Sequence, residues 1–267
     1  MNKGYIKVVL ALLSVAVYIS NEEKVHQKSP TDAEEHEQVL DIDPEETKQA
    51  ENIMTEALAH IQYHAENTDD YYLYSKEDEG AIIHFKKFNG TDIGKLELII
   101  PNPDCYDDVV NMLWDLNGAK NFDDTFIKGI IQQRHKTFFR KWDGYYHALA
   151  GKAQLSEDTT AIILVSSNMN DHDHKNNKDY INPIVESANS FKPDIDSEED
   201  IRNGKLSKTY INLVGFIIKQ ETDCIKITYL ISIDTNTYFF IPSSIIRNGM
   251  YYKILDIVKL RNIFEKE

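Results

Sequence analysis

The stretch that decides the fold is TYINLVGFIIKQETDCIKITYLISID, residues 209–234, together with the segment that follows it. Apolar and polar residues alternate in both halves of this stretch, which predicts β-strands over 209–219 and 224–234. One face of the second strand carries Ile225, Ile227, Tyr229, Ile231 and Ile233. Antiparallel strands that lead into a long helix predict a curved sheet gripping a helix, and such an arrangement encloses an apolar space.

The segment after Pro242 has the pattern of an amphipathic helix that runs to the C-terminus. Its apolar stripe recurs at spacings near three and four and carries Ile246, Met250, Ile254, Ile257 and Phe264. We take Ile246, Met250 and Ile254 as the lid of the apolar space. The candidate wall on the strands consists of Tyr229 with Ile211, Leu213, Ile227 and Ile231. A helix that packs on a filled core has the same pattern, so periodicity does not distinguish a core from a cavity.

The preceding segments predict an α+β domain. The expected elements are a helix from residue 44, strands over 81–88 and 91–100, a short helix over 109–114, and strands over 145–155 and 159–167. Asn89-Gly90, between the first two of these strands, is the strongest hairpin signal, because both residues tolerate a positive φ.

The N-terminal region has the composition of a targeting segment followed by a spacer. Two lysines precede the apolar run 8–19, which is shorter than the ~20 residues of a bilayer span. This pattern predicts a secretory signal peptide over residues 1–20, with an uncleaved membrane anchor as the alternative. Residues 21–43 are polar and acidic and predict a disordered linker. The folded domain is therefore expected over residues 44–267, and the protein is expected to be secreted.

The charge balance disfavours one large class of function. The chain has a formal net charge of −15 over 267 residues, whereas nucleic-acid binders need basic surface to displace counterions from phosphate. We expect no nucleic-acid partner and a monomeric protein. Arg247, Lys253, Lys259 and Arg261 offer a local basic patch for transient membrane contact, with ordinary solvated helix charges as the alternative.

The metal-ligating residue types do not indicate a site. Cys105 and Cys224 are too few for a structural zinc or iron–sulfur site, and we expect buried free thiols in preference to a disulfide. His60 and His64 lie one turn apart on the first helix and are interpreted as polar flank residues. Residues 171–174, Asp-His-Asp-His, are interpreted as a polar loop, because neighbours in a loop rarely converge on one ion. We expect no metal, no cofactor and no covalent catalysis.

Several uninterrupted strings of the sequence resemble one family. These strings are AENIMTEA at 50–57, MLWDLNGAKN at 112–121, YINPIVESANS at 180–190 and FKPDIDSEED at 191–200. They are similar to the fam-a proteins of malaria parasites. The resemblance implies a START-like helix-grip fold, in which a curved antiparallel sheet is closed by a C-terminal amphipathic helix. It further implies a non-enzymatic, secreted lipid-transfer protein with phosphatidylcholine as the favoured cargo, and some members are exported into the host red cell.

A phosphatidylcholine headgroup needs a cation for its phosphate and aromatic faces for its choline. Arg134, Trp142, Tyr145 and Tyr146 lie close in sequence and have these side-chain types. We take them as candidate headgroup residues. Ordinary core aromatics and a surface arginine are the alternative.

The chain departs from the resembled family in its middle. Relatives carry an additional strand and turn before residues 131–134, where this chain passes directly from Lys128-Gly129. Losing a strand would open a sheet edge or shrink the cavity. The competing hypothesis is therefore a host-facing interaction protein that keeps the fold without transfer activity. A helix-grip enzyme acting on a small apolar substrate is a third hypothesis, but the core strands are too apolar to supply convergent ionisable groups.

Overall fold

The computed structural model describes most of the expected domain. The described residues are 44–77, 80–114, 129–136, 143–176, 178–236 and 241–265. The expected signal peptide over 1–20, the expected linker over 21–43 and Trp142 lie outside these ranges. None of the helices within them combines the length and the hydropathy that a bilayer span requires.

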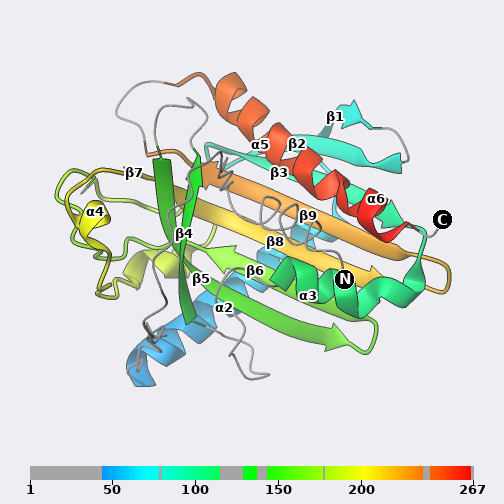
Figure 1. Ribbon diagram of the computed structural model, residues 1–267, viewed down its shortest axis with the longest axis horizontal. Helices are drawn as coiled ribbons and strands as arrows, with labels where there is room; N and C mark the ends of the chain where they lie inside the picture. The colour runs from blue at the N-terminus through cyan, green and yellow to red at the C-terminus, as the bar shows by residue number, and fades with distance from the viewer. Residues whose placement is uncertain are drawn as a thin grey trace, which may run out of the picture.

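The centre of the domain is one curved β-sheet (Figure 1). Its main strands are β1 (Tyr72–Lys76), β2 (Ile82–Phe88), β3 (Thr91–Ile100), β4 (Gly129–Lys136), β5 (Asp143–Ser156), β6 (Thr159–Val165), β8 (Tyr210–Gln220) and β9 (Ile225–Asp234). They follow the order β1-β2-β3-β9-β8-β6-β5-β4, with antiparallel pairing along this path. The short β7 (Ser207–Lys208) pairs in parallel with β5. Because β9 pairs with β3, strands from the N-terminal and the C-terminal parts of the chain belong to one sheet.

Helices cover both faces of the sheet (Figure 1). The rear face in that view carries α2 (Pro44–Glu66), and the front face carries α3 (Tyr106–Trp114), α5 (Ser243–Val258) and α6 (Leu260–Phe264). The shorter helical pieces are η2 (Pro103–Cys105), η4 (Glu186–Ser190) and α4 (Glu199–Arg202). The predicted α+β class with a helix gripped by the sheet is confirmed.

The sheet separates two apolar layers, because successive residues of a strand point to opposite faces. The front layer lies between the sheet and α3, α5 and α6, and includes Phe85, Leu96, Tyr146, Phe216, Tyr229, Met250 and Ile254. The rear layer lies between the sheet and α2, and includes Ile53, Ile61, Leu149, Ile163 and Leu230. The molecule thus has two cores that share the sheet as a common wall.

The predicted face of β9 is confirmed, and the predicted wall on β8 is wrong at one position. The alternate β9 residues from Ile225 to Ile233 all lie in the front layer. Leu213 of β8, however, lies in the rear layer. The register of β8 against β9 shifts between Ile211 and Leu213, and such an irregularity turns the residues that follow to the other face.

The hairpin prediction is confirmed in its geometry. Asn89 and Gly90 both have positive φ, at 47° and 82°, and Phe88 pairs with Thr91. These angles suit a primed turn, whose twist matches that of the flanking strands.

Two elements differ from the sequence expectation. The single C-terminal helix is interrupted at Lys259, so that α6 begins at Leu260, which is fully buried. The strand β4 is not indicated by its sequence pattern, because polar as well as apolar side chains occupy its buried face: Gln133 and His135 are buried beside Ile131.

Glycines allow the two long helices to approach the sheet closely. A Cβ added at Gly215 would lie 2.1 Å from Cδ1 of Ile61 on α2. A Cβ added at Gly94 would lie 3.0 Å from Cδ1 of Ile254 on α5. Each helix therefore crosses the sheet at a position where a larger residue would push it away.

The interpretation of both helix histidines as polar flank residues is wrong for His64. His64 is fully buried between α2 and the sheet, where Phe88 and Tyr71 pack edge-on against its ring. Its Nδ1 lies 3.2 Å from the Tyr71 hydroxyl. Burial, together with the nearby charge of Lys86, lowers the pKa of His64 from 6.5 to about 4.

Candidate functional site

The front layer brings together most of the predicted lid and wall residues. Tyr146 on β5 and Tyr229 on β9 are 1% and 5% exposed. Met250 and Ile254 of α5 are fully buried in the same layer, and Ile246 packs partly buried against it. The lid on α5 and the aromatic side chains on the sheet therefore belong to one apolar layer. Their role in binding stays a prediction.

Arg134 and Tyr145 face the other side of the sheet. They are paired across β4 and β5, and strand alternation turns Tyr145 away from its neighbour Tyr146. The Arg134 guanidinium donates to both carboxylate oxygens of Asp200, at 2.6 and 2.8 Å, and also to Glu198. The hydrogen bond raises the pKa of Arg134 and lowers that of Asp200. The guanidinium thus holds the α4 segment against the sheet.

Tyr145 belongs to a buried polar network on the rear side. Its hydroxyl lies 2.9 Å from Oδ2 of both Asp171 and Asp173. Lys208 Nζ lies 2.8 Å from Asp171 Oδ2, and His147 Nδ1 lies 3.4 Å from it. Burial opposes ionisation of Asp171, but the hydrogen bond with His147 and the charge of Lys208 hold its pKa well below the ordinary value. The network ties the loop at residues 168–176 to β5 and β7.

The side chains of residues 171–174 do not converge on one point. Asp171 and Asp173 bind Tyr145, whereas the exposed His172 places Nε2 3.1 Å from Asp194 Oδ1. A hollow of about 400 Å³ adjoins this loop, and Lys208 is among the residues that line it. These residues form a polar loop that the buried network anchors to β5 and β7.

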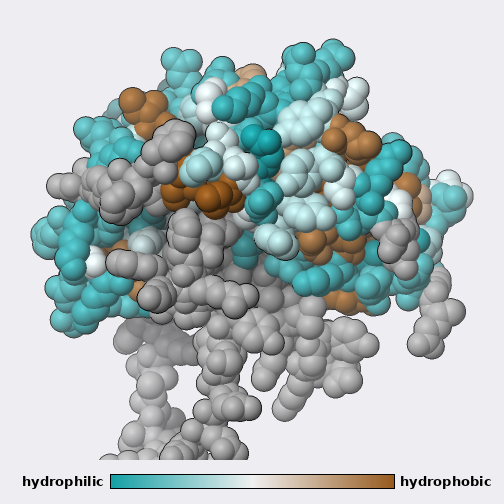
Figure 2. All heavy atoms as spheres, turned by 90° about the horizontal axis from the view of Figure 1, so that it is seen from above, coloured by the Kyte–Doolittle hydropathy of each residue, from teal (hydrophilic) through white to brown (hydrophobic). Residues whose placement is uncertain are grey.

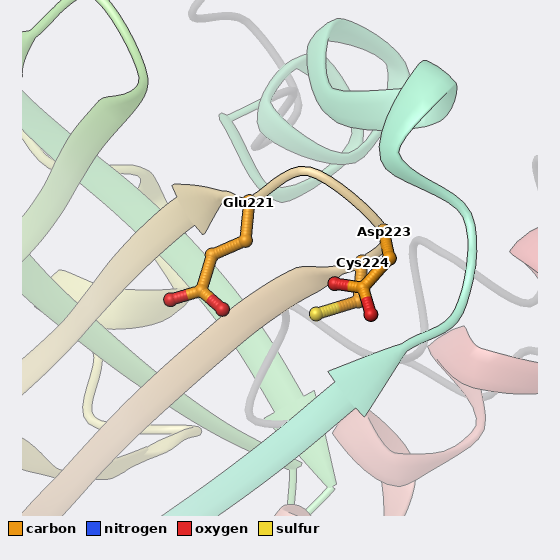
Figure 3. A group of neighbouring side chains, drawn as sticks. All are labelled: Glu221, Asp223 and Cys224. Carbon is orange, nitrogen blue, oxygen red and sulfur yellow. The ribbon is translucent and has the colours of Figure 1, made fainter.

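One carboxylate and thiol group in the described residues has the spacing of possible metal ligands (Figure 3). Glu221, Asp223 and Cys224 lie at the turn between β8 and β9, with one ligand atom of each within 4.8 Å of the others. Glu221 Oε2 is 2.8 Å from the ammonium of Lys226. Cys224 and Cys105 are buried free thiols, which confirms the expectation, and burial raises the pKa of Cys224.

Two tyrosine hydroxyls, those of Tyr146 and Tyr229, are among the polar groups that the sheet contributes to the front layer. The Tyr229 ring stacks on Phe216 with centroids 4.5 Å apart. Burial raises the pKa of Tyr146 and of Tyr229, and the latter is raised further by Tyr146 and Asp256. Both phenols therefore stay protonated at neutral pH and can donate a hydrogen bond.

The two flanks of α5 have different surroundings. On the flank toward β1, the Tyr251 hydroxyl donates to Glu77 at 2.8 Å and the Tyr74 hydroxyl donates to Asn248 at 2.7 Å. On the opposite flank, Lys253 is half-buried, and burial lowers its pKa to about 8. The first flank is hydrogen-bonded to the β1 edge, whereas the second carries the half-buried ammonium of Lys253.

The expected basic patch on the C-terminal helices consists largely of paired charges. Arg247 lies 3.7 Å from Asp92, Lys259 lies 2.6 Å from Asp256, and Arg261 lies 3.5 Å from Glu265. Seen from above, hydrophobic residues on this side of the molecule form separate groups among hydrophilic ones (Figure 2). The exposed large apolar residues of β1 and α5 are Tyr72, Leu73, Ile245 and Tyr252.

The comparisons with known proteins point to one fold. No protein-family model matches the chain, and no curated protein matches it. Among solved structures, human StAR-related lipid transfer protein 5 aligns with a TM-score of 0.54 and 8% identity, covering 82% of this chain and 97% of that one. Human STARD10 aligns at 0.50 and 10%, covering 76% of each chain. The lipid transfer and protein localization domain of human StarD13 aligns at 0.50 and 12%, covering 79% and 97%.

The fold is therefore that of START domains, a curved sheet closed by a C-terminal helix. At such low identity the likeness shows the fold alone. Any binding role depends on this chain's own residues, and the front layer between the sheet and α5 is the candidate position.

Sequence reasoning placed Lys253 on the surface with the other basic residues of the helix. A signal for its burial was present, because Lys253 follows Met250 by three positions and precedes Ile257 by four, and both are fully or almost fully buried. Residues at these spacings share one side of a helix.

Proposed function

We propose that this protein binds lipid in the front layer, between the sheet and α5, and transfers phospholipid between membranes, with phosphatidylcholine as the favoured cargo. The observation that carries the proposal is the START fold with an apolar layer at the place where its C-terminal helix closes the sheet. The proteins with the same fold include one named as a lipid transfer protein. Among the described residues, no group in the front layer suggests covalent chemistry, so we propose a carrier and not an enzyme.

The energetics of cargo burial support an apolar layer as the binding place. Each methylene that leaves water contributes ~0.8 kcal/mol, so a diacyl lipid has a large driving force toward an apolar enclosure. The front layer offers aliphatic and aromatic side chains from the sheet and from α5. Lipid chains could replace contacts between these two surfaces without exposing hydrocarbon to water.

Cargo entry requires α5 to move. The side chain of Ile254 sits directly over Gly94 of β3, so in this conformation the helix lies tight against the sheet. Its contacts with the β1 edge include hydrogen bonds of the Tyr251 and Tyr74 hydroxyls, which can break and reform. Gating of this kind would open the front layer at a membrane and close it in water.

Lipid transfer and native mass spectrometry test the proposal together. The purified protein should carry a phospholipid in native spectra and should move fluorescent phosphatidylcholine from donor to acceptor vesicles. Met250→Trp, which fills the front layer, should slow transfer, whereas Tyr252→Trp on the exposed side of the same helix should not. Circular dichroism checks that both variants fold.

The negative result also has a clear meaning. A folded protein that carries no lipid and moves none would contradict the carrier proposal and support the alternative, an interaction protein that keeps the fold.

We further propose that the protein is secreted and related to the fam-a proteins, with export to the host red cell as one destination. The support is the N-terminal signal-like sequence and the strings quoted above. Mass spectrometry of the mature protein from its native source should find a new N-terminus near residue 20. An intact N-terminus on a membrane-bound product would instead support the uncleaved anchor.

A further inference from the structure

The front layer contains hydroxyl groups that an entirely apolar cargo would not need. Tyr146 and Tyr229 are more than nine-tenths buried, and no hydrogen-bond partner of either hydroxyl is found within the described ranges. The two phenols are therefore available to donate to a polar group of a ligand.

The position of Lys253 on α5 places it on the same side as these phenols. Arg247 and Tyr251 reach the acidic groups Asp92 and Glu77, and so mark the flank of α5 that faces the β1 edge. Lys253 lies on the opposite flank, toward β9 and the strands beyond it in the sheet. Asp256, three residues further along the helix, shares this flank with Lys253, and its charge raises the pKa of both Lys253 and Tyr229.

Within the described ranges, the ammonium of Lys253 has no carboxylate at ion-pair distance. No hydrogen bond or ion pair of Lys253 is found in the part of the chain that the structure describes. The nearest carboxylate along the helix, Asp256, binds Lys259 at 2.6 Å. A half-buried cation on the flank of α5 toward β9, above a layer that contains two phenol donors, has the composition of a site for an anionic oxygen group.

We propose that Lys253, together with the hydroxyls of Tyr146 and Tyr229, binds the phosphate of a phosphodiester lipid whose acyl chains occupy the front layer. This inference rests on the proposed function and names the polar end of its cargo. The ammonium supplies a point charge and the phenols supply directional hydrogen bonds to the phosphate oxygens. A neutral lipid such as diacylglycerol offers no anionic oxygen to the ammonium.

Uptake of labelled lipids from vesicles tests the assignment. Phosphatidylcholine vesicles would carry, in separate arms, a fluorescent phosphatidylcholine, a fluorescent diacylglycerol or a fluorescent fatty acid, and the lipid bound to re-isolated protein would be measured. Lys253→Met should lower phosphatidylcholine uptake about 10-fold, as expected for one lost charge-assisted hydrogen bond, and should leave diacylglycerol uptake unchanged. Tyr146→Phe and Tyr229→Phe should each lower phosphatidylcholine uptake several-fold. Lys87→Met, which removes an exposed charge from β2, is the control.

A second measurement reports on the lysine directly. Reductive ¹³C-methylation followed by NMR titration should show the Lys253 amine with a pKa below that of the other lysines. Loading with phosphatidylcholine should raise that pKa, because an anion favours the charged amine, and loading with diacylglycerol should not.

The outcomes separate this inference from the proposed function. If the wild-type protein takes up none of the three lipids, the proposed function itself fails. If it takes up phosphatidylcholine and Lys253→Met does so equally well, the headgroup assignment is overturned and the carrier proposal stands. A wild-type preference for the fatty acid over phosphatidylcholine would overturn the phosphodiester assignment, since a carboxylate would then be the anion.

Discussion

The buried imidazole of His64 predicts that the domain loses stability in mildly acidic solution. The side chain is fully buried beside Tyr71 and Phe88, and burial first, then the nearby Lys86, lowers its pKa from 6.5 to about 4. The folded protein therefore keeps His64 neutral at pH values where the unfolded chain has already bound a proton. The perturbation that removes this effect is His64→Phe, which keeps a ring in the site but cannot be protonated.

The sign and the size of the effect follow from proton linkage. Above pH 6.5 His64 is neutral in both states and adds no pH dependence. As the pH falls from 6.5 toward 4, only the unfolded state gains a proton, so the free energy of unfolding decreases, and below about 4 the loss levels off. A shift of this size corresponds to about 3 kcal/mol in total, of which about 2 kcal/mol is lost by pH 5.

Urea unfolding monitored by tryptophan fluorescence provides the assay. The free energy of unfolding would be measured for the wild type and for His64→Phe at several pH values between about 7.5 and 5. We expect the wild type to lose about 2 kcal/mol more than the variant over this range. His60→Phe is the matched control, because His60 lies one turn away and is not fully buried. Equal pH dependence in the wild type and in His64→Phe would refute the reasoning.

Three further predictions concern packing and charge. Ile254→Ala removes a fully buried side chain of α5 and should lower the free energy of unfolding by about 2–5 kcal/mol in urea titrations, whereas an unchanged midpoint would show that the helix is not packed there. Gly215→Ala should cost about 1–3 kcal/mol, because the new Cβ meets Ile61, and adding Ile61→Val should recover part of that loss in the same assay. Lys208→Met leaves Asp171 buried without its ammonium and should cost about 3–5 kcal/mol by thermal or urea unfolding, with Lys192→Met as a control from the same hollow.

Much of the fold could be predicted from the sequence where a single physical rule dominates locally. The Asn89-Gly90 turn and the alternation of β9 were correct, since turn chemistry and one-sided burial act over a few residues. Prediction failed where the rule was broken by tertiary contacts. The irregularity before Leu213 reverses the face of β8, and β4 escapes detection because Gln133 and His135 are buried.

Part of the candidate site could be predicted from the sequence. The lid and wall residues were predicted from periodicity, whereas the headgroup residues were not. The apolar lid and wall follow from periodicity, which reports the face of an element. The headgroup candidates were chosen by closeness in sequence, and in a strand neighbours such as Tyr145 and Tyr146 point to opposite faces. Pairing partners are also invisible in a single sequence, so the engagement of Arg134 by Asp200 could not be foreseen.

The division of the interior into two layers means that one layer can open or change its side chains while the other keeps the domain folded. If α5 swings outward, the layer beneath α2 keeps its contacts, so the open form retains the rear core and need not approach the unfolded state. Relatives could then exchange side chains on the α5 side to suit different cargo while the α2 side preserves the scaffold. Variation among homologous sequences should accordingly concentrate on one side of each central strand.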